Sequence, residues 1–312
     1  MNKTATSVAG SDDLTVAGGN SGHGYRHKSR IRTNFGIYGG VFPFFIYALL
    51  FFGLPTFRVV YLAFQNQDGG WTLSNVRESV KGIYLLSFER SLELSAVSSI
   101  TGAILGFTAA YAIAISSRPA LRRVVQTASG VFANTGGVPL AFMFIATIGT
   151  YGLVTKALKV FGIDLYAGGW TLFTFTGLVL VYLFFQIPLM IIVILPAIDG
   201  LRLEWREAAA SLGGSKWQFW RYVAGPLLLP PFTGAVLLLF ANSFAAYATA
   251  SALTSGTIPL VPLQIGSLVS GNVIADRANL GYALGFGMIV IIGIVMGSYA
   301  YLEKRSAKWL RR

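Results

Sequence analysis

Residues 171–197 read T-L-F-T-F-T-G-L-V-L-V-Y-L-F-F-Q-I-P-L-M-I-I-V-I-L-P-A and contain no charged side chain. A helix needs about 20 consecutive, mainly apolar residues to cross the hydrocarbon core of a bilayer, whereas the apolar helices of soluble cores are shorter. The stretch therefore predicts a transmembrane helix, and it places the chain among the membrane proteins.

Five further apolar stretches lie on either side of this one. The chain is 54% hydrophobic and 12% charged, whereas about 25% of the residues of a soluble domain are charged. A soluble protein of 312 residues could not bury so many apolar stretches. We therefore predict an all-α polytopic membrane protein with six transmembrane helices. The expected spans are 36–63, 92–116, 131–152, 171–197, 228–251 and 279–302.

The lysines and arginines predict the orientation of these spans. If the N-terminus is placed in the cytoplasm, 17 of the 24 basic residues lie in cytoplasmic segments and 7 in outer ones. Cytoplasmic loops of membrane proteins carry an excess of such residues, so both termini are expected in the cytoplasm. This distribution also explains the net charge of +12, and no nucleic-acid partner is expected.

The two ends of the chain differ from its apolar middle. Residues 1–34 are rich in Gly, Ser, Thr and Asn and are expected to form a disordered cytoplasmic tail. Residues 35–64 are expected to hold the first transmembrane helix. Residues 303–312 contain five lysines and arginines and are expected to form a basic cytoplasmic tail.

Several glycines recur four residues apart inside the expected spans. Such spacing lets helix backbones approach each other closely. The partner helix could belong to this chain or to another subunit. The pairs are Gly102 and Gly106, Gly281 and Gly285, and Gly293 and Gly297.

The sequence offers little for catalysis. It has no cysteine, and its two histidines, His23 and His27, both lie in the N-terminal tail, so neither a metal site nor a cofactor is expected. No G-x-x-x-x-G-K-[ST] phosphate loop occurs, so the chain is not expected to hydrolyse ATP itself. The spans also lack paired carboxylates, which disfavours both an enzyme and a secondary transporter driven by an ion gradient.

Polar residues inside the spans are candidates for a translocation path, because an unpaired polar group in lipid is costly. The alternative is that they form hydrogen bonds between helices, which is the commoner role. The candidates are Asn134, Thr135, Gln186, Asn242, Ser243 and Tyr247.

The segment 199–226, which the charges place in the cytoplasm, has a distinctive local pattern. Residues 201–212 are good helix formers, and Gly213 and Gly214 end that helix because glycine accepts the left-handed cap conformation. Ser215 and Gln218 have the spacing of a capping box and begin a second helix. Tryptophans, an arginine and a tyrosine follow, which suits the level of the lipid headgroups.

This segment resembles the EAA loop of ABC-transporter permeases of the binding-protein-dependent type, which have the type I importer (MetI-like) fold. Glu207, Ala208 and Ala209 match the first part of that pattern, and Gly213 has the expected spacing. Val223 and Pro226 match its end, although Gly225 stands where the family has leucine. The resemblance covers about 88–302, which would form a core of five transmembrane helices. Residues 43–55 resemble the extra N-terminal helix of many such permeases.

The resemblance implies that the loop docks on a cytoplasmic ATPase. The implied docking residues are Glu207, Ala208, Ala209, Leu212 and Gly213. The implied partners are two ATP-binding subunits, a second permease that is identical or different, and an extracytoplasmic substrate-binding protein. The implied location is the bacterial cytoplasmic (inner) membrane.

Within the family, three segments look most like the polyamine, opine and phosphonate group. They are E-W-R-E-A-A-A-S-L-G-G-S at 204–215, N-T-G-G-V-P-L-A-F-M-F at 134–144 and G-T-I-P-L-V-P-L-Q-I at 256–265. Ferric-iron, sulfate, thiamine and sugar-phosphate permeases share much of this pattern, so these solutes remain alternatives.

Overall fold

The computed structural model describes residues 42–270 and 277–310. The expected tail at 1–34 lies outside the described residues. The chain divides into two compact units, 1–53 and 54–312. In the first unit, residues 42–48 are helical and continue as a π-helix, Leu49–Gly53. Apart from the first candidate membrane span, which begins in the first unit, the following paragraphs concern the second unit.

The described part of the chain contains six helical segments that are long and apolar enough to cross a membrane. They are Phe42–Ala63, Gly82–Ala114, Gly137–Val160, Phe175–Asp199, Lys216–Ala245 and Ala278–Tyr301. The prediction of an all-α protein with six transmembrane helices is therefore confirmed. The second of them begins ten residues earlier than expected, because its first turns extend beyond the most apolar part of the sequence.

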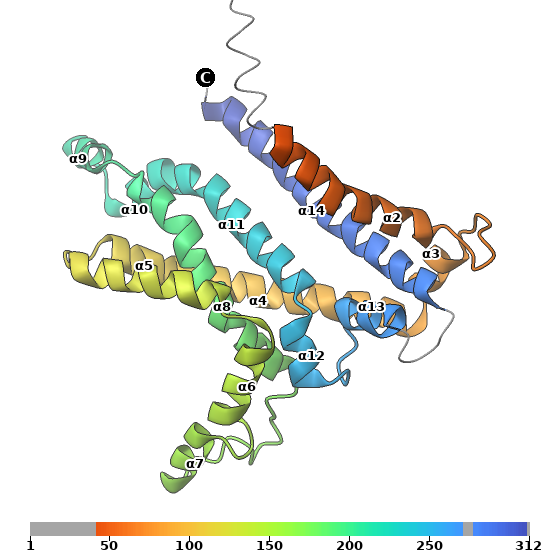
Figure 1. Cartoon of the computed structure of the whole chain (residues 1–312). Coiled ribbons are helices and arrows are strands. Elements are labelled where there is room, and N and C mark those ends of the chain that lie inside the picture. Colours follow the sequence, from red (N-terminus) through yellow and green to blue (C-terminus); the bar gives the residue numbers. More distant parts are fainter. Residues whose placement is uncertain (1–41, 271–276, 311–312) are drawn as a thin grey trace, which may run out of the picture. The chain divides into compact units, whose positions relative to one another are not determined.

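Figure 1 shows the arrangement of the helices. The bounds in the second unit are α2 (Leu54–Ala63), α3 (Ser74–Ser79), α4 (Gly82–Ala114), α5 (Pro119–Asn134), α6 (Gly137–Ile148), α7 (Leu153–Val160), α8 (Phe175–Asp199), α9 (Leu203–Ser211), α10 (Lys216–Phe219), the π-helix η2 (Trp220–Ala224), α11 (Gly225–Ala245), α12 (Ala248–Thr254), α13 (Val261–Val269) and α14 (Ala278–Leu310).

Helix α8 is the centre of the packing. Helices α4, α5 and α11 all pack against it, and α11 also packs against α4. The contact between α4 and α8 depends on two glycines of α4. A Cβ atom on Gly102 would lie 2.9 Å from Cβ of Gln186, and one on Gly106 would lie 2.5 Å from Cβ of Met190. This glycine pair therefore packs within the chain.

Helix α14 lies beside α2 (Figure 1), and it also contacts α3 and α13. The glycines of α14 divide into two groups. A Cβ on Gly281 would approach the side chain of Val269 to 2.9 Å, whereas Cβ atoms on Gly293 and Gly297 would meet no atom within 4 Å. The last pair thus faces outward from the described part of this chain. The described residues of the expected basic tail continue α14 as far as Leu310.

Helix α5 was not expected, since its arginines made 117–130 look like a loop. It is an amphipathic helix that begins with Pro119 in its first turn, where the missing N–H of proline costs nothing. It packs on α8, where the rings of Phe132 and Phe184 have centroids 5.3 Å apart, whereas Leu121, Val124 and Val131 remain exposed. The third span, expected at 131–152, therefore contains the last turn of α5 and all of α6. The helix is interrupted between them.

Candidate translocation site and coupling loop

Two pairs of consecutive helices, each including a candidate membrane span, are separated by two-residue interruptions at 135–136 and 246–247. Helix α5 ends at Asn134, and α6 begins at Gly137, whose φ of +77° is a conformation that favours glycine. Helix α11 ends at Ala245, and α12 begins at Ala248. Interrupted helices free backbone polar groups inside the membrane, and such backbone is tolerated only where protein buries it or a cavity hydrates it.

The two interruptions are hydrogen-bonded to each other. The N–H of Gly137 donates to the Thr249 hydroxyl at 2.8 Å, and that hydroxyl lies 3.3 Å from the Gly137 carbonyl, to which it donates. The Tyr182 hydroxyl donates to the Ala246 carbonyl at 3.1 Å. Freed backbone groups in both interruptions are thereby satisfied.

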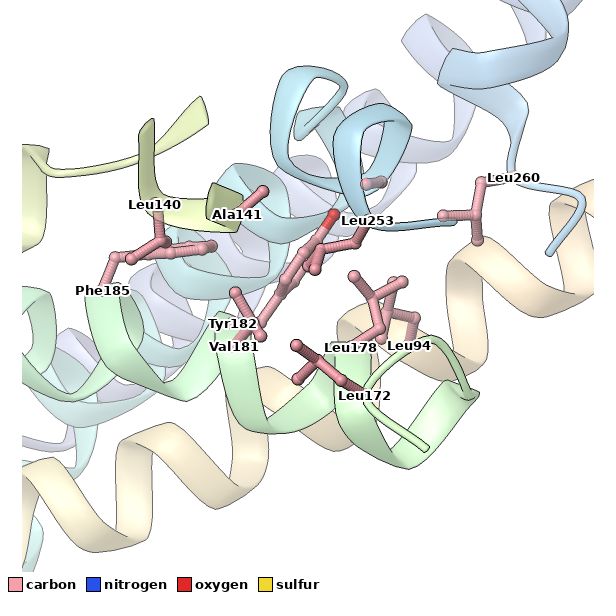
Figure 2. Close-up of a cluster of buried hydrophobic side chains, with 11 residues drawn as sticks. Leu94, Leu140, Ala141, Leu172, Leu178, Val181, Tyr182, Phe185, Leu253 and Leu260 are labelled. Atoms are coloured by element: carbon pink, nitrogen blue, oxygen red, sulfur yellow. The ribbon is translucent and has the colours of Figure 1, made fainter. Parts of the chain in front are cut away.

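Tyr182 also belongs to the buried apolar cluster next to the interruptions. Figure 2 shows its ring extending from α8 toward Leu253 of α12, with Leu178 and Leu94 nearby. Leu140 of α6 lies against Phe185 in the same view. This cluster fixes α6 and α12 on α8, so the positions of the two interruptions are set by apolar packing as well as by hydrogen bonds.

A cavity of about 380 Å³ lies between the interruptions. None of the described residues that line it is charged. Its polar side chains are two amides, a phenol and a threonine hydroxyl. The lining residues are Ala133, Asn134, Gly136, Gly137, Phe185, Asn242, Ala245, Ala246, Tyr247, Ala248 and Thr249.

The structure separates the six candidate path residues into two groups. Asn134, Asn242 and Tyr247 line the cavity. Gln186 and Ser243 do not line it, since they lie in a buried cluster between helices. Thr135 lies in the interruption itself, where its hydroxyl donates to the Val131 carbonyl at 2.9 Å.

The buried polar cluster joins α4, α8 and α11. Nε2 of Gln186 donates to the Ser98 hydroxyl at 3.1 Å, and the hydroxyls of Ser98 and Ser243 are 2.8 Å apart. Gln186 is 0% exposed. Its Oε1 atom accepts no hydrogen bond from the described residues. A buried oxygen without a donor is costly. The Oε1 atom of Gln186 is therefore a polar group that weakens the packing of these helices.

Thr249, Phe185 and Ser98 were not among the predicted residues. Ser98 belongs to a row of serines in α4, and Ser87, Ser91 and Ser95 are also buried. This row of serines at helical spacing within an apolar span was a usable signal. Thr249 lies in an alanine-rich stretch with no comparable pattern, so its partnership with Gly137 could be recognised only from the fold.

The loop that follows α8 forms the expected helix, turn and second helix. Helix α9 has no buried residue. Leu212, at its end, is 89% exposed. Gly213 has a φ of +77° and turns the chain, and a Cβ on Gly214 would lie only 2.8 Å from the Ala209 carbonyl.

The capping box at the start of α10 is present. Gln218 N–H donates to the Ser215 hydroxyl at 3.2 Å, and Ser215 N–H donates to Oε1 of Gln218 at 2.7 Å. From here α10, η2 and α11 form one continuous helical segment. A displacement of α9 is therefore linked through one short turn to a helix that reaches the cavity.

Ion pairs join segments that the charge distribution places on the same side of the membrane. Arg122 of α5 is paired with Asp199 at the end of α8. Nη1 of Arg277 lies 2.9 Å from Oε1 of Glu78. The first pair lies next to the loop, and the second joins the two outer segments.

These features define an all-helical, multi-spanning membrane protein with a polar cavity between interrupted helices and an exposed helical loop. Residues 102–308 match the family described as the binding-protein-dependent transport system inner membrane component. Because the match covers more than half of the chain, the chain belongs to this family. The resemblance seen in the EAA loop is thereby confirmed.

Proteins similar to this chain carry names that refer to different solutes. The chain is 29% identical to the thiamine transport system permease protein ThiP of Escherichia coli. The alignment spans 209 residues and covers 65% of this chain and 36% of the relative. It is 25% identical to a spermidine/putrescine transport system permease protein PotC homolog of Mycoplasma pneumoniae, covering 86% and 93%. It is 22% identical to the molybdenum transport system permease protein ModB of Azotobacter vinelandii, covering 68% and 91%.

A solved structure shares the fold. A chain of a bacterial ABC transporter involved in the import of the acidic polysaccharide alginate superposes with a TM-score of 0.68 at 17% identity. The alignment covers 88% of this chain and 97% of that one. The prediction of a type I ABC importer permease fold is confirmed.

Proposed function

We propose that this protein is a permease subunit of an ATP-driven importer and that α9 is its contact with the ATPase. The observation that carries the proposal is that α9, a helix of the loop between α8 and α11, has no buried residue. Exposed apolar residues such as Leu203 and Leu212 on this helix suit a protein partner. The partners would be two ATP-binding subunits, a second permease and an extracytoplasmic binding protein.

The chemistry of α9 suits docking. Ala208 and Ala209 let a partner approach closely, and Glu207 offers a charge to a basic groove. Gly213 fixes the turn that connects α9 to the continuous segment of α10, η2 and α11. A rigid connection of this kind transmits closure of the ATPases to the membrane helices. With α9 in the cytoplasm, the charge distribution puts both termini of the chain there as well.

We propose that the cavity between the interruptions is this chain's share of the translocation path. Asn134, Asn242 and Tyr247 would contact the solute there. Gln186 and Ser243 would act from behind the lining, by holding α8 and α11 to α4 through Ser98. Thr135 would hold the end of α5 in place.

The lining favours an organic cation such as a polyamine. Helices α5 and α11 both end at the cavity, and the carbonyl end of a helix carries partial negative charge. Two helices, α6 and α12, begin there; α6 has fewer free donors than usual, because its Gly137 N–H is bonded to Thr249 and Pro139 has none. Phe185 and Tyr247 add aromatic faces, which attract cations.

Other solutes would need a cavity lined by different polar and charged groups. An opine or a phosphonate carries anionic groups, and the cavity has amide donors but no described cation for them. Ferric-iron, sulfate, thiamine and sugar-phosphate importers share the sequence pattern. An ion-coupled secondary transporter would function without an ATPase, which separates it from the importer experimentally.

The docking proposal is tested by exchanging the charge of Glu207. We expect Glu207→Arg to release the ATPase during purification and to abolish transport in vesicles. Glu204→Arg is the matched control, because it makes the same charge change on the same helix outside the docking residues. Transport that persists without an ATPase, or that ignores the Glu207 change, would contradict the proposal.

The solute is tested on the partner binding protein. Calorimetry with putrescine, an aminophosphonate and ferric iron separates the candidates. We expect binding of the diamine alone. Binding of either other solute in its place would assign the importer to that solute and would leave the ATPase docking unaffected.

A further inference from the structure

A second cavity, of about 250 Å³, lies behind the loop of residues 199–226, called the coupling loop below. It is enclosed by the last turns of α4, by α9 and by the start of α10 and η2. Its volume is below the range of about 300–1,000 Å³ that is typical of sites for whole drug-sized ligands. The residues that line it are Tyr111, Arg206, Ala209, Ala210, Gly214, Ser215, Lys216, Phe219 and Trp220.

Two cations face this cavity, and no described acidic residue lines it. Arg206 comes from α9 and Lys216 from the first turn of α10. Neither belongs to any of the four ion pairs in the described part of the chain. Two uncompensated positive charges around one small volume raise the local potential and attract an anion.

Three of the lining residues are aromatic. The rings of Tyr111 and Trp220 meet edge to face, with centroids 5.2 Å apart. Phe219 and Trp220 are only partly exposed. Tryptophan and tyrosine gather at the level of lipid headgroups because each combines an apolar ring with a polar atom. The cavity is thus lined by both cationic and aromatic side chains, a combination that suits the boundary between water and membrane.

We propose that this cavity binds the phosphate ester of an anionic phospholipid headgroup, with Arg206 and Lys216 as its two charged contacts. A guanidinium group binds phosphate oxygens through two parallel hydrogen bonds, and an ammonium group adds a point charge. Basic pockets on the cytoplasmic side of membrane proteins bind such headgroups. The proposal uses the cytoplasmic placement of the loop proposed above but requires no ATPase.

The geometry links lipid binding to the loop. A headgroup in this cavity would contact both α9, through Arg206, and α10, through Lys216. It would therefore hold the two arms of the loop at a fixed separation on either side of Gly214. Free inorganic phosphate has the same chemistry and could occupy the cavity from the cytoplasm.

The test compares two double variants with equal charge. R206Q/K216Q removes both cations of the cavity. R202Q/R221Q removes two cations of the same loop that do not line it, since Arg202 lies over the Trp205 ring and Arg221 over the Tyr222 ring. The importer with its partner subunits is placed in nanodiscs of phosphatidylcholine containing a minor fraction of phosphatidylglycerol. Retained lipid is then measured by native mass spectrometry.

We expect the wild type and R202Q/R221Q to retain phosphatidylglycerol and R206Q/K216Q to bind it at least about tenfold more weakly, as the loss of a charged hydrogen bond requires. Equal retention by all three proteins, or equal loss in both variants, would overturn the proposal. A folding defect in R206Q/K216Q is recognised by a lower melting temperature in pure phosphatidylcholine. In that case R206K/K216R, which keeps both charges, must retain the lipid for the proposal to hold.

Two further outcomes decide the source of the phosphate and the role of the ATPase. If inorganic phosphate stabilises the wild type in pure phosphatidylcholine and R206Q/K216Q abolishes the effect, the lipid assignment is overturned in favour of a free anion. If R206Q/K216Q loses the ATPase but keeps the lipid, the cations contact a protein carboxylate and the proposal fails. Glu207→Arg should lose the ATPase and keep the lipid, so failure of either proposal is recognised separately.

Discussion

Gly137 and Thr249 form two hydrogen bonds with each other across 112 positions of sequence, one at 2.8 Å and one at 3.3 Å. One residue begins α6, and the other lies in the first turn of α12. A single side-chain hydroxyl thus satisfies both the N–H and the carbonyl at the start of an interrupted membrane helix. The two interruptions that border the polar cavity are therefore coupled by one residue.

We expect Thr249→Val to uncouple the interruptions. Valine has nearly the same shape but leaves the Gly137 N–H without a partner, which costs about 1–3 kcal/mol. The melting temperature of the purified protein should fall, and transport in vesicles should fall further, because the cavity would lose its shape. Thr249→Ser retains the hydroxyl and should preserve most of both. Equal behaviour of the two variants would show that the hydroxyl is unimportant.

Gln186 should separate stability from transport. Its Oε1 atom lacks a donor, and Ser98 and Ser243 remain bonded to each other without it. Replacing Gln186 by an apolar residue of similar length removes the unsatisfied Oε1 atom and leaves the Ser98 hydroxyl bonded to Ser243, so its cost in stability should be small. We therefore expect Gln186→Met to leave the melting temperature unchanged or higher while it lowers the transport rate. A variant that is less stable yet transports normally would contradict this view.

Alanine substitutions should destabilise the protein at glycines that face other helices and should have little effect at glycines that face outward. A Cβ at Gly106 would overlap Met190 and lie 2.8 Å from the Ile187 carbonyl oxygen. Gly106→Ala should therefore cost about 1–3 kcal/mol by overpacking. Gly293→Ala meets nothing within 4 Å in this chain and is the control for an alanine substitution in a membrane helix. Thermal unfolding of both variants in detergent measures the difference.

If Gly293→Ala is harmless in the isolated chain but weakens the assembled importer, Gly293 contacts a partner subunit. The two alternatives for the glycine pairs would then both hold, each for a different pair. Equal destabilisation by both substitutions would instead contradict the packing of α4 on α8.

Gly213 should tolerate asparagine better than valine. Its φ of +77° lies in the left-handed region, which costs an ordinary residue roughly 1–2 kcal/mol and a β-branched one more. We expect Gly213→Val to disturb the turn and reduce transport-coupled ATP hydrolysis, whereas Gly213→Asn should keep most of it. Basal hydrolysis by the detached ATPase serves as the reference.

The sequence predicted the number of spans well because a transmembrane helix is defined by length and apolarity, which are local properties. It also predicted the loop, since the glycine turn and the capping box of Ser215 and Gln218 depend on neighbouring residues. Helix α5 was missed because the amphipathic pattern of an arginine-containing helix is hidden next to apolar spans.

The cavity was predicted only in part. Asn134, Asn242 and Tyr247 are conspicuous in apolar stretches, and the structure brings them together around the cavity. Gln186 is equally conspicuous but is directed into the packing between helices. No local rule distinguishes these cases, because the interruptions at 135–136 and 246–247 decide which residues line the cavity. They depend on tertiary partners such as Thr249 and Tyr182.

The ion pair between Arg122 and Asp199 should affect coupling more than stability. Both side chains are about one-third exposed, and exposed pairs are worth about 0–1 kcal/mol. Yet Asp199 immediately precedes the coupling loop, and Arg122 lies on α5, whose other end borders the cavity. We expect Asp199→Arg to change the melting temperature little but to reduce transport for each ATP hydrolysed.

The exchanged pair Arg122→Asp with Asp199→Arg should restore that ratio, because it re-forms the link between α5 and the loop. If the exchange restores nothing while Asp199→Arg impairs transport, Asp199 acts through a partner subunit and not through α5.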